Sequence, residues 1–191
     1  GMVFVGADLS QAEARVVAYL AREDRLIEIF DGGGDIHRKN ASHIFNKPEE
    51  AISKEERYLA KRVVHASNYG MGVNKFAQVA GIPKEQATKL LNSYFASFPR
   101  IKVWHLEIQD QLRRTRILTT PLGRTRQFMG AWNDDLLRVA YAFIPQATVS
   151  DILNQGLVCA YEALKAENLG EVMLQVHDSI MVQCKIENVD Q

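Results

Sequence analysis

The sequence predicts an α+β fold in which strands lie near both ends of the chain and helices fill the middle. Residues 2–5 form an apolar, strand-like run that ends shortly afterwards in Asp8, and a helical pattern follows at once. Residues 172–182 contain two β-prone runs around a short polar interruption, which predicts a hairpin with His177 and Asp178 at its tip.

The first strand would place Asp8 at its C-terminal end, where substrates and metals commonly bind in α/β structures. Ser10 followed by Glu13 has the form of a capping box, which predicts the start of a helix. Taken alone, Asp8 is typical of a solvated strand end and Asp178 of a turn. The alternative is that both carboxylates hold a pair of cations, since two-metal phosphoryl transfer needs acidic oxygens around ions roughly 4 Å apart. Mg²⁺ suits a site with one or two carboxylates plus substrate phosphates.

A basic and aromatic stripe is predicted between these two elements. Arg57, Lys61, His65 and Tyr69 recur every four residues, so on one helix they would form a stripe about 18 Å long, which Gly70 can end. Such a stripe fits a triphosphate with a base stacked at its far end. The spacing alone favours the alternative, a solvated face of an amphipathic helix.

The remaining segments are predicted to be mostly helical. We expect a flexible loop at 31–35, which lacks the ending of a P-loop, and a helical stretch that begins at Pro48. Two helices are expected within 74–95, separated near 81–83, and a long helix after Pro99. An arginine-rich β turn is expected within 118–128, followed by a helix over about 135–166. Pro145 is expected to kink or interrupt that last helix.

Composition sets the outer limits on function. Formal net charge is +0 and 47% of the residues are hydrophobic, as in an ordinary globular protein. No apolar run approaches the roughly 20 residues of a membrane span. Cys159 and Cys184 are too few and too far apart to predict a zinc site, and a reducing compartment is the default expectation. Basic residues gather over 100–126, where only Glu107 and Asp110 oppose them, so this segment is a candidate for phosphate contacts, or else a solvated helix face.

Taken together and in this order, these elements resemble the family A DNA polymerases, the bacterial DNA polymerase I group and its phage relatives. The resemblance covers nearly the whole chain. Residues 8–15 are similar to the family's first palm motif, residues 57–70 to its fingers-helix motif and residues 175–178 to its third motif. Residues 122–124, 146–148 and 35–37 resemble further landmarks.

The resemblance implies template-directed DNA synthesis in replication or repair, by nucleotidyl transfer from a deoxynucleoside triphosphate (dNTP) to a primer 3′-OH. It implies that Asp8, Asp178 and the backbone carbonyl of Leu9 bind two Mg²⁺ ions. The residues implied to bind the dNTP are Gln11, Glu13, His37, Arg57, Lys61, His65 and Tyr69, with Glu13 crowding the 2′ position of the sugar. The residues implied to contact the primer–template are Arg138, Gln146, Gln175 and His177.

The resemblance also implies a right-hand polymerase architecture. Residues 1–30 and 120–191 would form the palm, an antiparallel sheet with packed helices, and residues 31–119 an inserted helical fingers subdomain. The thumb and the exonuclease are expected to be absent and the palm truncated at its C-terminus, so that the fragment alone would be weakly active or inactive. The expected location is the cytoplasm of a bacterial cell or phage-infected host, and the protein is expected to act as a monomer that does not bind a membrane.

Three positions depart from the family's pattern. His65 stands where Phe or Tyr is usual, Ser179 where Glu is usual, and Leu9 where Tyr is usual. The triplet His177-Asp178-Ser179 is also similar to single-subunit phage-type RNA polymerases, which is one alternative function. Residues 77–87 have a helix-turn-helix-like pattern with Gly81 at the turn, and a non-catalytic DNA-binding module is the other alternative.

Overall fold

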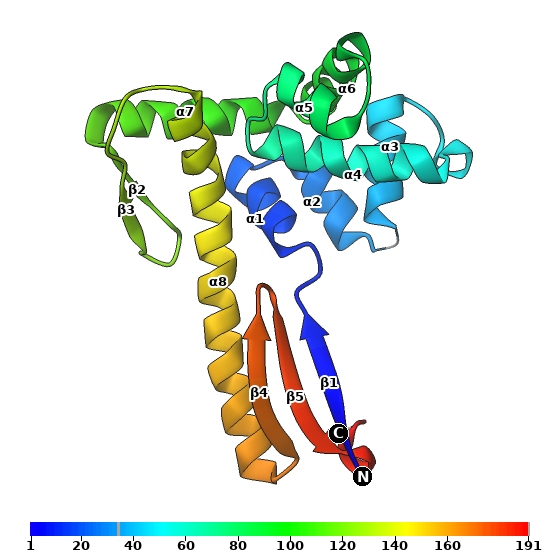
Figure 1. Cartoon of the computed structure of the whole chain (residues 1–191), viewed down its shortest axis with the longest axis vertical. Coiled ribbons are helices and arrows are strands. Elements are labelled where there is room, and N and C mark those ends of the chain that lie inside the picture. The colour runs from blue at the N-terminus through cyan, green and yellow to red at the C-terminus, as the bar shows by residue number, and fades with distance from the viewer. Residues whose placement is uncertain (34, 191) are drawn as a thin grey trace. The chain divides into compact units, whose positions relative to one another are not determined.

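The structure is a computed structural model that describes residues 1–33 and 35–190. It confirms the predicted α+β class, with the strands of one sheet near the two ends of the chain and helices between them (Figure 1). Contacts divide the chain into two compact units. The terminal unit comprises Gly1–Glu13 together with the chain from Gln146 onward, and the central unit comprises Ala14–Pro145.

A three-stranded antiparallel sheet organises the terminal unit. Strand β1 (Met2–Asp8) pairs with β5 (Ser179–Lys185), which pairs on its other side with β4 (Gly170–Val176), giving the order β1-β5-β4 (Figure 1). The register of β1 on β5 runs from Met2 opposite Lys185 to Asp8 opposite Ser179. The C-terminal end of β1 therefore lies beside the start of β5.

The core of the terminal unit is small. Ile180 and Cys184 of β5 are buried, and so are Val149 and Leu153. The last two belong to α8 (Asp134–Glu167), the long helix that precedes the sheet, and a short 3₁₀ helix (Ile186–Asn188) follows β5. Because side chains alternate across a strand, the face that carries Ile180 and Cys184 is the one turned to this core.

The central unit is mainly helical. It contains most of α1 (Ala12–Ala21), then α2 (Asp24–Asp31), α3 (Ile36–Phe45), a 3₁₀ turn (Glu49–Ala51), α4 (Lys54–Asn68), α5 (Val73–Ala80), α6 (Lys84–Ser97), α7 (Pro99–Thr115), the hairpin β2 (Ile117–Thr119) and β3 (Thr125–Gln127), and the start of α8. Its core is a continuous apolar cluster in which Phe76, Tyr94, Phe98 and Ile101 are among the largest fully buried side chains.

Local sequence signals explain where the central helices begin and end. Ser53 and Glu56 form a complete capping box at the start of α4. Asp35 caps α3 by accepting a hydrogen bond from the Arg38 amide, and Pro99 occupies the first turn of α7. Gly81 follows α5 in a left-handed conformation and α6 begins at Lys84, so the predicted split between two helices is confirmed.

Two local predictions need correction. Helix α8 continues through Pro145, so the predicted interruption is wrong, while the alternative of a kink stays a prediction. The missing N–H of Pro145 removes only one hydrogen bond from a 34-residue helix. The predicted loop at 31–35 is shorter than expected, since Asp31 still belongs to α2, and Gly34 lies outside the described residues.

Within the described part of the chain, no helix combines the length and the apolar composition that crossing a membrane requires. Both cysteines are free: Cys159 is exposed and Cys184 is buried.

Candidate functional site

The end of β1 and the tip of the β4–β5 hairpin lie side by side. Asp8, the last residue of β1, is opposite Ser179, and one step further the Leu9 amide donates a 3.0 Å hydrogen bond to the Asp178 carbonyl. Residues opposed in this way have Cα atoms about 4.5–5.5 Å apart. The two acidic residues that are far apart in sequence are therefore neighbours at one end of the sheet.

The hairpin tip has the predicted two residues, His177 and Asp178, between Val176 and Ser179. His177 adopts a left-handed backbone with φ +53°, which reverses the chain. The Ser179 hydroxyl donates a 2.8 Å hydrogen bond to the Val176 carbonyl and so closes the tip. The tip leaves the His177 side chain exposed and the Asp178 side chain half-buried.

The donor atoms at this end of the sheet fit a hard cation. Asp8 is exposed and Asp178 half-buried, and the Leu9 carbonyl accepts a long 3.4 Å hydrogen bond from the Ala12 amide. A carbonyl oxygen has two lone pairs, so this bond does not use its full capacity as a ligand. All three donors are oxygens, as Mg²⁺ prefers. Among the described residues, no group of three or more His, Cys, Asp or Glu side chains is arranged to hold a metal unaided, so substrate oxygens would have to complete the coordination.

In the central unit, α4 presents the predicted stripe on its accessible side. Lys61 and His65 are exposed and Arg57 and Tyr69 half-buried, whereas Ala60, Val63, Val64 and Ser67 on the opposite side are buried. The rings of His65 and Tyr69 meet edge to face, with centroids 4.8 Å apart. Tyr69 follows the last helical residue, and Gly70 then reverses the chain with φ +65°.

His37 of α3 joins the cationic end of this stripe. The pKa of His37 is lowered, first by burial and then by the positive charges of Lys61 and Arg57. Those electrostatic interactions bring the imidazole and both cations into one group on the packed pair α3 and α4. A neutral imidazole beside two cations gives this surface a positive potential without adding a third charge.

Asp35 is a member of this group that the sequence reasoning did not include. Its Oδ2 lies 2.7 Å from Arg57 Nε, and the guanidinium holds the pKa of the Asp35 carboxyl below its usual range. Asp35 also caps α3 through its other oxygen, 3.1 Å from the Arg38 amide. A carboxylate just before a helix and two residues before His37 is the signal that could have suggested this role.

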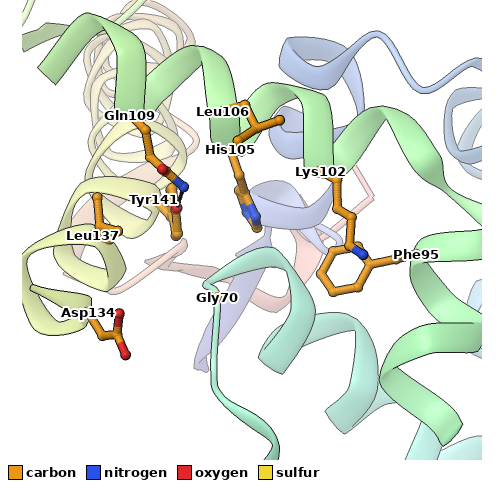
Figure 2. A pocket seen from close by; sticks show the side chains of 9 residues that line it. All are labelled: Gly70, Phe95, Lys102, His105, Leu106, Gln109, Asp134, Leu137 and Tyr141. Carbon is orange, nitrogen blue, oxygen red and sulfur yellow. Dashed lines mark hydrogen bonds between the residues drawn. The ribbon is translucent and has the colours of Figure 1, made fainter. Parts of the chain in front are cut away.

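A pocket of about 350 Å³ opens beside the C-terminal end of α4 (Figure 2). It is lined by Gly70, Phe95, Lys102, His105, Leu106, Gln109, Asp134, Leu137 and Tyr141. Figure 2 shows His105 and Tyr141 projecting from α7 and α8 toward the Gly70 segment. Their rings stack at 4.0 Å between centroids and 18° between planes.

Polar contacts hold this pocket against α4. His105 Nε2 lies 2.9 Å from the Asn68 carbonyl oxygen, and Gln109 Nε2 donates a 2.7 Å hydrogen bond to the Tyr141 hydroxyl. The buried Tyr94 hydroxyl donates to Asn68 Oδ1 at 2.7 Å. Burial lowers the pKa of His105, so the ring is neutral with its proton on Nε2. Sequence reasoning missed these residues because their partners come from four different helices.

The remaining predicted residues lie as follows. Gln11 and Glu13 are half-buried at the start of α1, Gln146 and Gln175 are exposed, and Arg138 pairs with Asp135 one turn earlier in α8. The predicted residues of the terminal unit are Asp8, Leu9, Gln11, Glu13, Gln146, Gln175, His177 and Asp178, and those of the central unit are His37, Arg57, Lys61, His65, Tyr69 and Arg138. The predicted residues are thus divided between the two units.

Comparisons with known proteins find similar sequences that match the chain over most or all of its length. The sequence model of a family described as DNA polymerase family A matches residues 1–191. Thermostable DNA polymerase I of Thermus aquaticus is 31% identical over 197 residues, covering 100% of this chain and 23% of the relative. DNA polymerase I of Geobacillus stearothermophilus is 32% identical over 191 residues, covering 96% of this chain and 22% of the relative.

A solved structure is similar as well. The polymerase domain of Pol1 from M. smegmatis, in complex with a DNA primer–template and dNTP, superimposes with a TM-score of 0.89 at 29% identity, covering 96% of this chain and 34% of that one. The chain therefore spans less than a quarter of the length of the curated relatives named above.

Proposed function

The chain belongs to DNA polymerase family A, and from that premise we propose that it carries the catalytic centre of a template-directed DNA polymerase. The observation that supports this most directly is the pairing of β1 with β5, which makes Asp8 and Asp178 neighbours through the Leu9–Asp178 hydrogen bond. Two carboxylates at one exposed sheet end are what phosphoryl transfer with two cations requires.

Asp8, Asp178 and the Leu9 carbonyl are proposed to hold two Mg²⁺ ions together with the phosphates of the dNTP. Mg²⁺ bound there would supply Lewis acidity and would neutralise negative charge during phosphoryl transfer. The protein's own contribution is to fix its oxygens at the rigid end of a sheet. No side chain has to act as an obligatory base, because positioning and charge neutralisation carry most of this reaction.

Arg57, Lys61 and His37 are proposed to hold the triphosphate. Arg57 already makes an ion pair with Asp35, so an incoming phosphate would exchange one anionic partner for another. Asp35 would thereby keep the Arg57 guanidinium oriented while no substrate is bound. Because His37 is neutral, it would donate one hydrogen bond to a phosphate oxygen without fixing an extra charge.

The sugar and base are proposed to meet the other end of the stripe. His65 would stack on the nucleotide, and Tyr69 would lie near the templating position. Glu13 would crowd the sugar so that deoxynucleotides are preferred, and Gln11 would also bind the dNTP. The exposed His65 ring held edge-on by Tyr69 supports this, since its free surface can accept a base.

DNA is proposed as the partner of the remaining residues. Arg138, Gln146, Gln175 and His177 would contact the primer–template near the growing end. The palm would comprise residues 1–30 and 120–191 and the fingers residues 31–119, boundaries that cut the chain at different points from the two contact-defined units. We place the activity in the cytoplasm of a bacterial cell or phage-infected host, with the protein acting as a monomer.

The direct test is primer extension by the purified protein with Mg²⁺ and each class of nucleotide. Asp8→Asn and Asp178→Asn should abolish incorporation, while Glu171→Gln, which removes a carboxylate from the same sheet, should retain it. Normal extension by either aspartate variant would remove these residues from the mechanism. Ribonucleotides used as fast as deoxynucleotides would instead support the RNA polymerase alternative.

A binding measurement covers the case in which the chain alone turns over too slowly. Mn²⁺, a paramagnetic substitute for Mg²⁺, should bind in the presence of dNTP and broaden the resonances of the hairpin tip in the unaltered protein and in Glu171→Gln. Asp8→Asn and Asp178→Asn should lose that broadening. Equal broadening in all four proteins would contradict the proposed site.

A further inference from the structure

The C-terminal end of α4 leaves one backbone carbonyl that the main chain does not satisfy. The last four carbonyls of an α-helix have no partner within the helix itself. Three of those in α4 accept hydrogen bonds from the amides of residues 69–71, at 2.8–3.3 Å, as the left-handed Gly70 turns the chain back on the helix. The fourth is the carbonyl of Asn68, to which no described backbone amide donates.

A side chain from another helix supplies the missing donor. His105 of α7 places Nε2 2.9 Å from the Asn68 carbonyl oxygen. Because a carbonyl oxygen can only accept, Nε2 carries the proton and donates it to this bond. Asn68 is only 3% exposed, so loss of the donor would leave a buried acceptor unsatisfied. His105 therefore caps the last carbonyl of α4.

The His105 ring is held in place by its aromatic neighbours. The Tyr141 ring stacks on it with 4.0 Å between centroids, and the Trp104 and Phe95 rings lie 5.4 and 6.3 Å from it. Figure 2 shows His105 and Tyr141 projecting together toward the segment of Gly70. The ring is thus fixed in the orientation that directs Nε2 at the end of α4.

The capped carbonyl belongs to the peptide that leads into Tyr69. A peptide unit is planar, so the Asn68 carbonyl and the Tyr69 amide can only turn together. The Asn68 side chain is fixed as well, because the buried Tyr94 hydroxyl donates to Oδ1 at 2.7 Å. Tyr69 in turn meets the ring of His65 edge to face at 4.8 Å. The hydrogen bond from His105 thus fixes the plane from which the Tyr69 side chain projects.

We propose that His105 is a positioning residue for nucleotide selection: by capping the Asn68 carbonyl it sets the direction of Tyr69, and with it the discrimination between matching and mismatching dNTPs. His105 itself touches neither nucleotide nor metal. The role of Tyr69 and His65 beside the nucleotide rests on the proposed function, whereas the cap does not. Displacements of about 1 Å at a reacting centre can cost on the order of 10²-fold in rate, so a small movement of Tyr69 is enough.

Titration of dNTPs into the protein with Mg²⁺ and a primer–template tests the inference, with a dideoxy-terminated primer that cannot be extended. His105→Phe keeps a flat ring but lacks the donor. It should lower the ratio of affinities for matching over mismatching dNTP roughly 10-fold, while the affinity for primer–template stays the same. His105→Gln, whose amide nitrogen can take the place of Nε2, should restore most of that ratio. If His105→Phe does not fold, His105→Leu replaces it, since leucine also lacks the donor.

Ser93→Ala is the matched control. The Ser93 hydroxyl donates to the Ile44 carbonyl in the last turn of α3, so this variant also removes a side-chain donor from a helix end in the central unit. It should keep the selectivity of the unaltered protein. Unchanged selectivity in His105→Phe would overturn the inference, and so would an equal loss in Ser93→Ala or in His105→Gln, since either would show a general effect of destabilisation.

Amide hydrogen exchange measures the cap without any nucleotide. Loss of one hydrogen bond should make exchange at residues 69–71 roughly 10-fold faster in His105→Phe, with near-normal exchange in His105→Gln and Ser93→Ala. Unchanged exchange in His105→Phe would refute the positioning. If the unaltered protein neither binds nor incorporates a dNTP, the proposed function fails, and the exchange measurement alone then decides whether His105 positions this segment.

Discussion

The amide of Leu9 donates a 3.0 Å hydrogen bond to the carbonyl of Asp178, and this single backbone contact ties the end of β1 to the tip of the β4–β5 hairpin. It extends the β1–β5 ladder by one residue beyond Asp8. The two carboxylates are therefore positioned by main chain, which does not depend on the identity of the Leu9 side chain.

Leu9→Pro should consequently lower the rate of primer extension, whereas Leu9→Ala, which keeps the amide donor, should not. Proline removes the donor, which costs about 0.5–1.5 kcal/mol of stability, and an error of about 1 Å at a reacting centre can cost on the order of 10²-fold in rate. Primer extension and circular dichroism on both variants check this. Comparable activity in the two would show that the backbone bond does not position the carboxylates.

Gly70→Ala should destabilise the central unit more than Gly81→Ala. Both glycines have a left-handed backbone, with φ +65° and +67°, so each substitution should cost about 1–2 kcal/mol. A Cβ on Gly70 would also lie 2.7 Å from the Tyr141 ring, whereas one on Gly81 meets nothing within 4 Å. Overpacking of that kind typically adds about 1–3 kcal/mol, and urea unfolding measures the difference. In the double variant Gly70→Ala/Tyr141→Leu, the smaller side chain should remove the destabilisation that comes from the clash with the Tyr141 ring.

Stability should fall as the pH drops below about 6.5, because the pKa values of both His37 and His105 are lowered in the folded protein. The unfolded chain then binds more protons than the folded one, so the folded state loses stability with acidification. His105→Asn should reduce the slope of unfolding free energy against pH by up to about 1.4 kcal/mol per pH unit, the value for one proton. Urea unfolding between pH 5 and 8 is the measurement, with exposed His43→Asn as control.

The Asp35–Arg57 ion pair should stabilise the folded protein over a different pH range from the histidines. Folding lowers the pKa of Asp35, so the pair stabilises fully above pH 3.8, the ordinary pKa of an aspartate. This stabilisation disappears as the pH falls through the lowered pKa of Asp35 in the folded protein. Asp35→Asn keeps the helix cap and should cost about 0.2–1 kcal/mol at pH 7, because the pair is partly exposed. Asp35→Ala should cost about 1 kcal/mol more through the lost cap. At pH 3 the difference between Asp35→Asn and the unaltered protein should shrink.

His65→Phe should change the preference for deoxy over dideoxy nucleotides while leaving primer–template affinity the same. The His65 ring is exposed beside Tyr69 and would contact the nucleotide and not the duplex. Single-nucleotide incorporation measures selectivity, and anisotropy with labelled duplex measures affinity. His43→Phe, an exposed histidine on α3, is the control. Selectivity that is unaltered in His65→Phe would count against this placement.

Much of the local structure could be predicted because its causes act over a few residues. The helix end at Gly81 and the two-residue tip at His177 and Asp178 each follow from a short sequence signal. The errors were also local. Asp31 belongs to α2 where a loop was predicted, and Pro145 does not interrupt α8, whose other hydrogen bonds outweigh its missing donor.

By itself, the sequence determined the type of each element, the four-residue stripe on α4 and the two acidic residues at the ends of predicted strands. Only the tertiary structure decided which of these meet: Asp8 with the hairpin tip, Asp35 with Arg57, and His105 with the end of α4. The reason is physical. Propensity and capping are set by neighbours along the chain, whereas strand register, ion pairs between helices and buried hydrogen bonds depend on how distant segments pack.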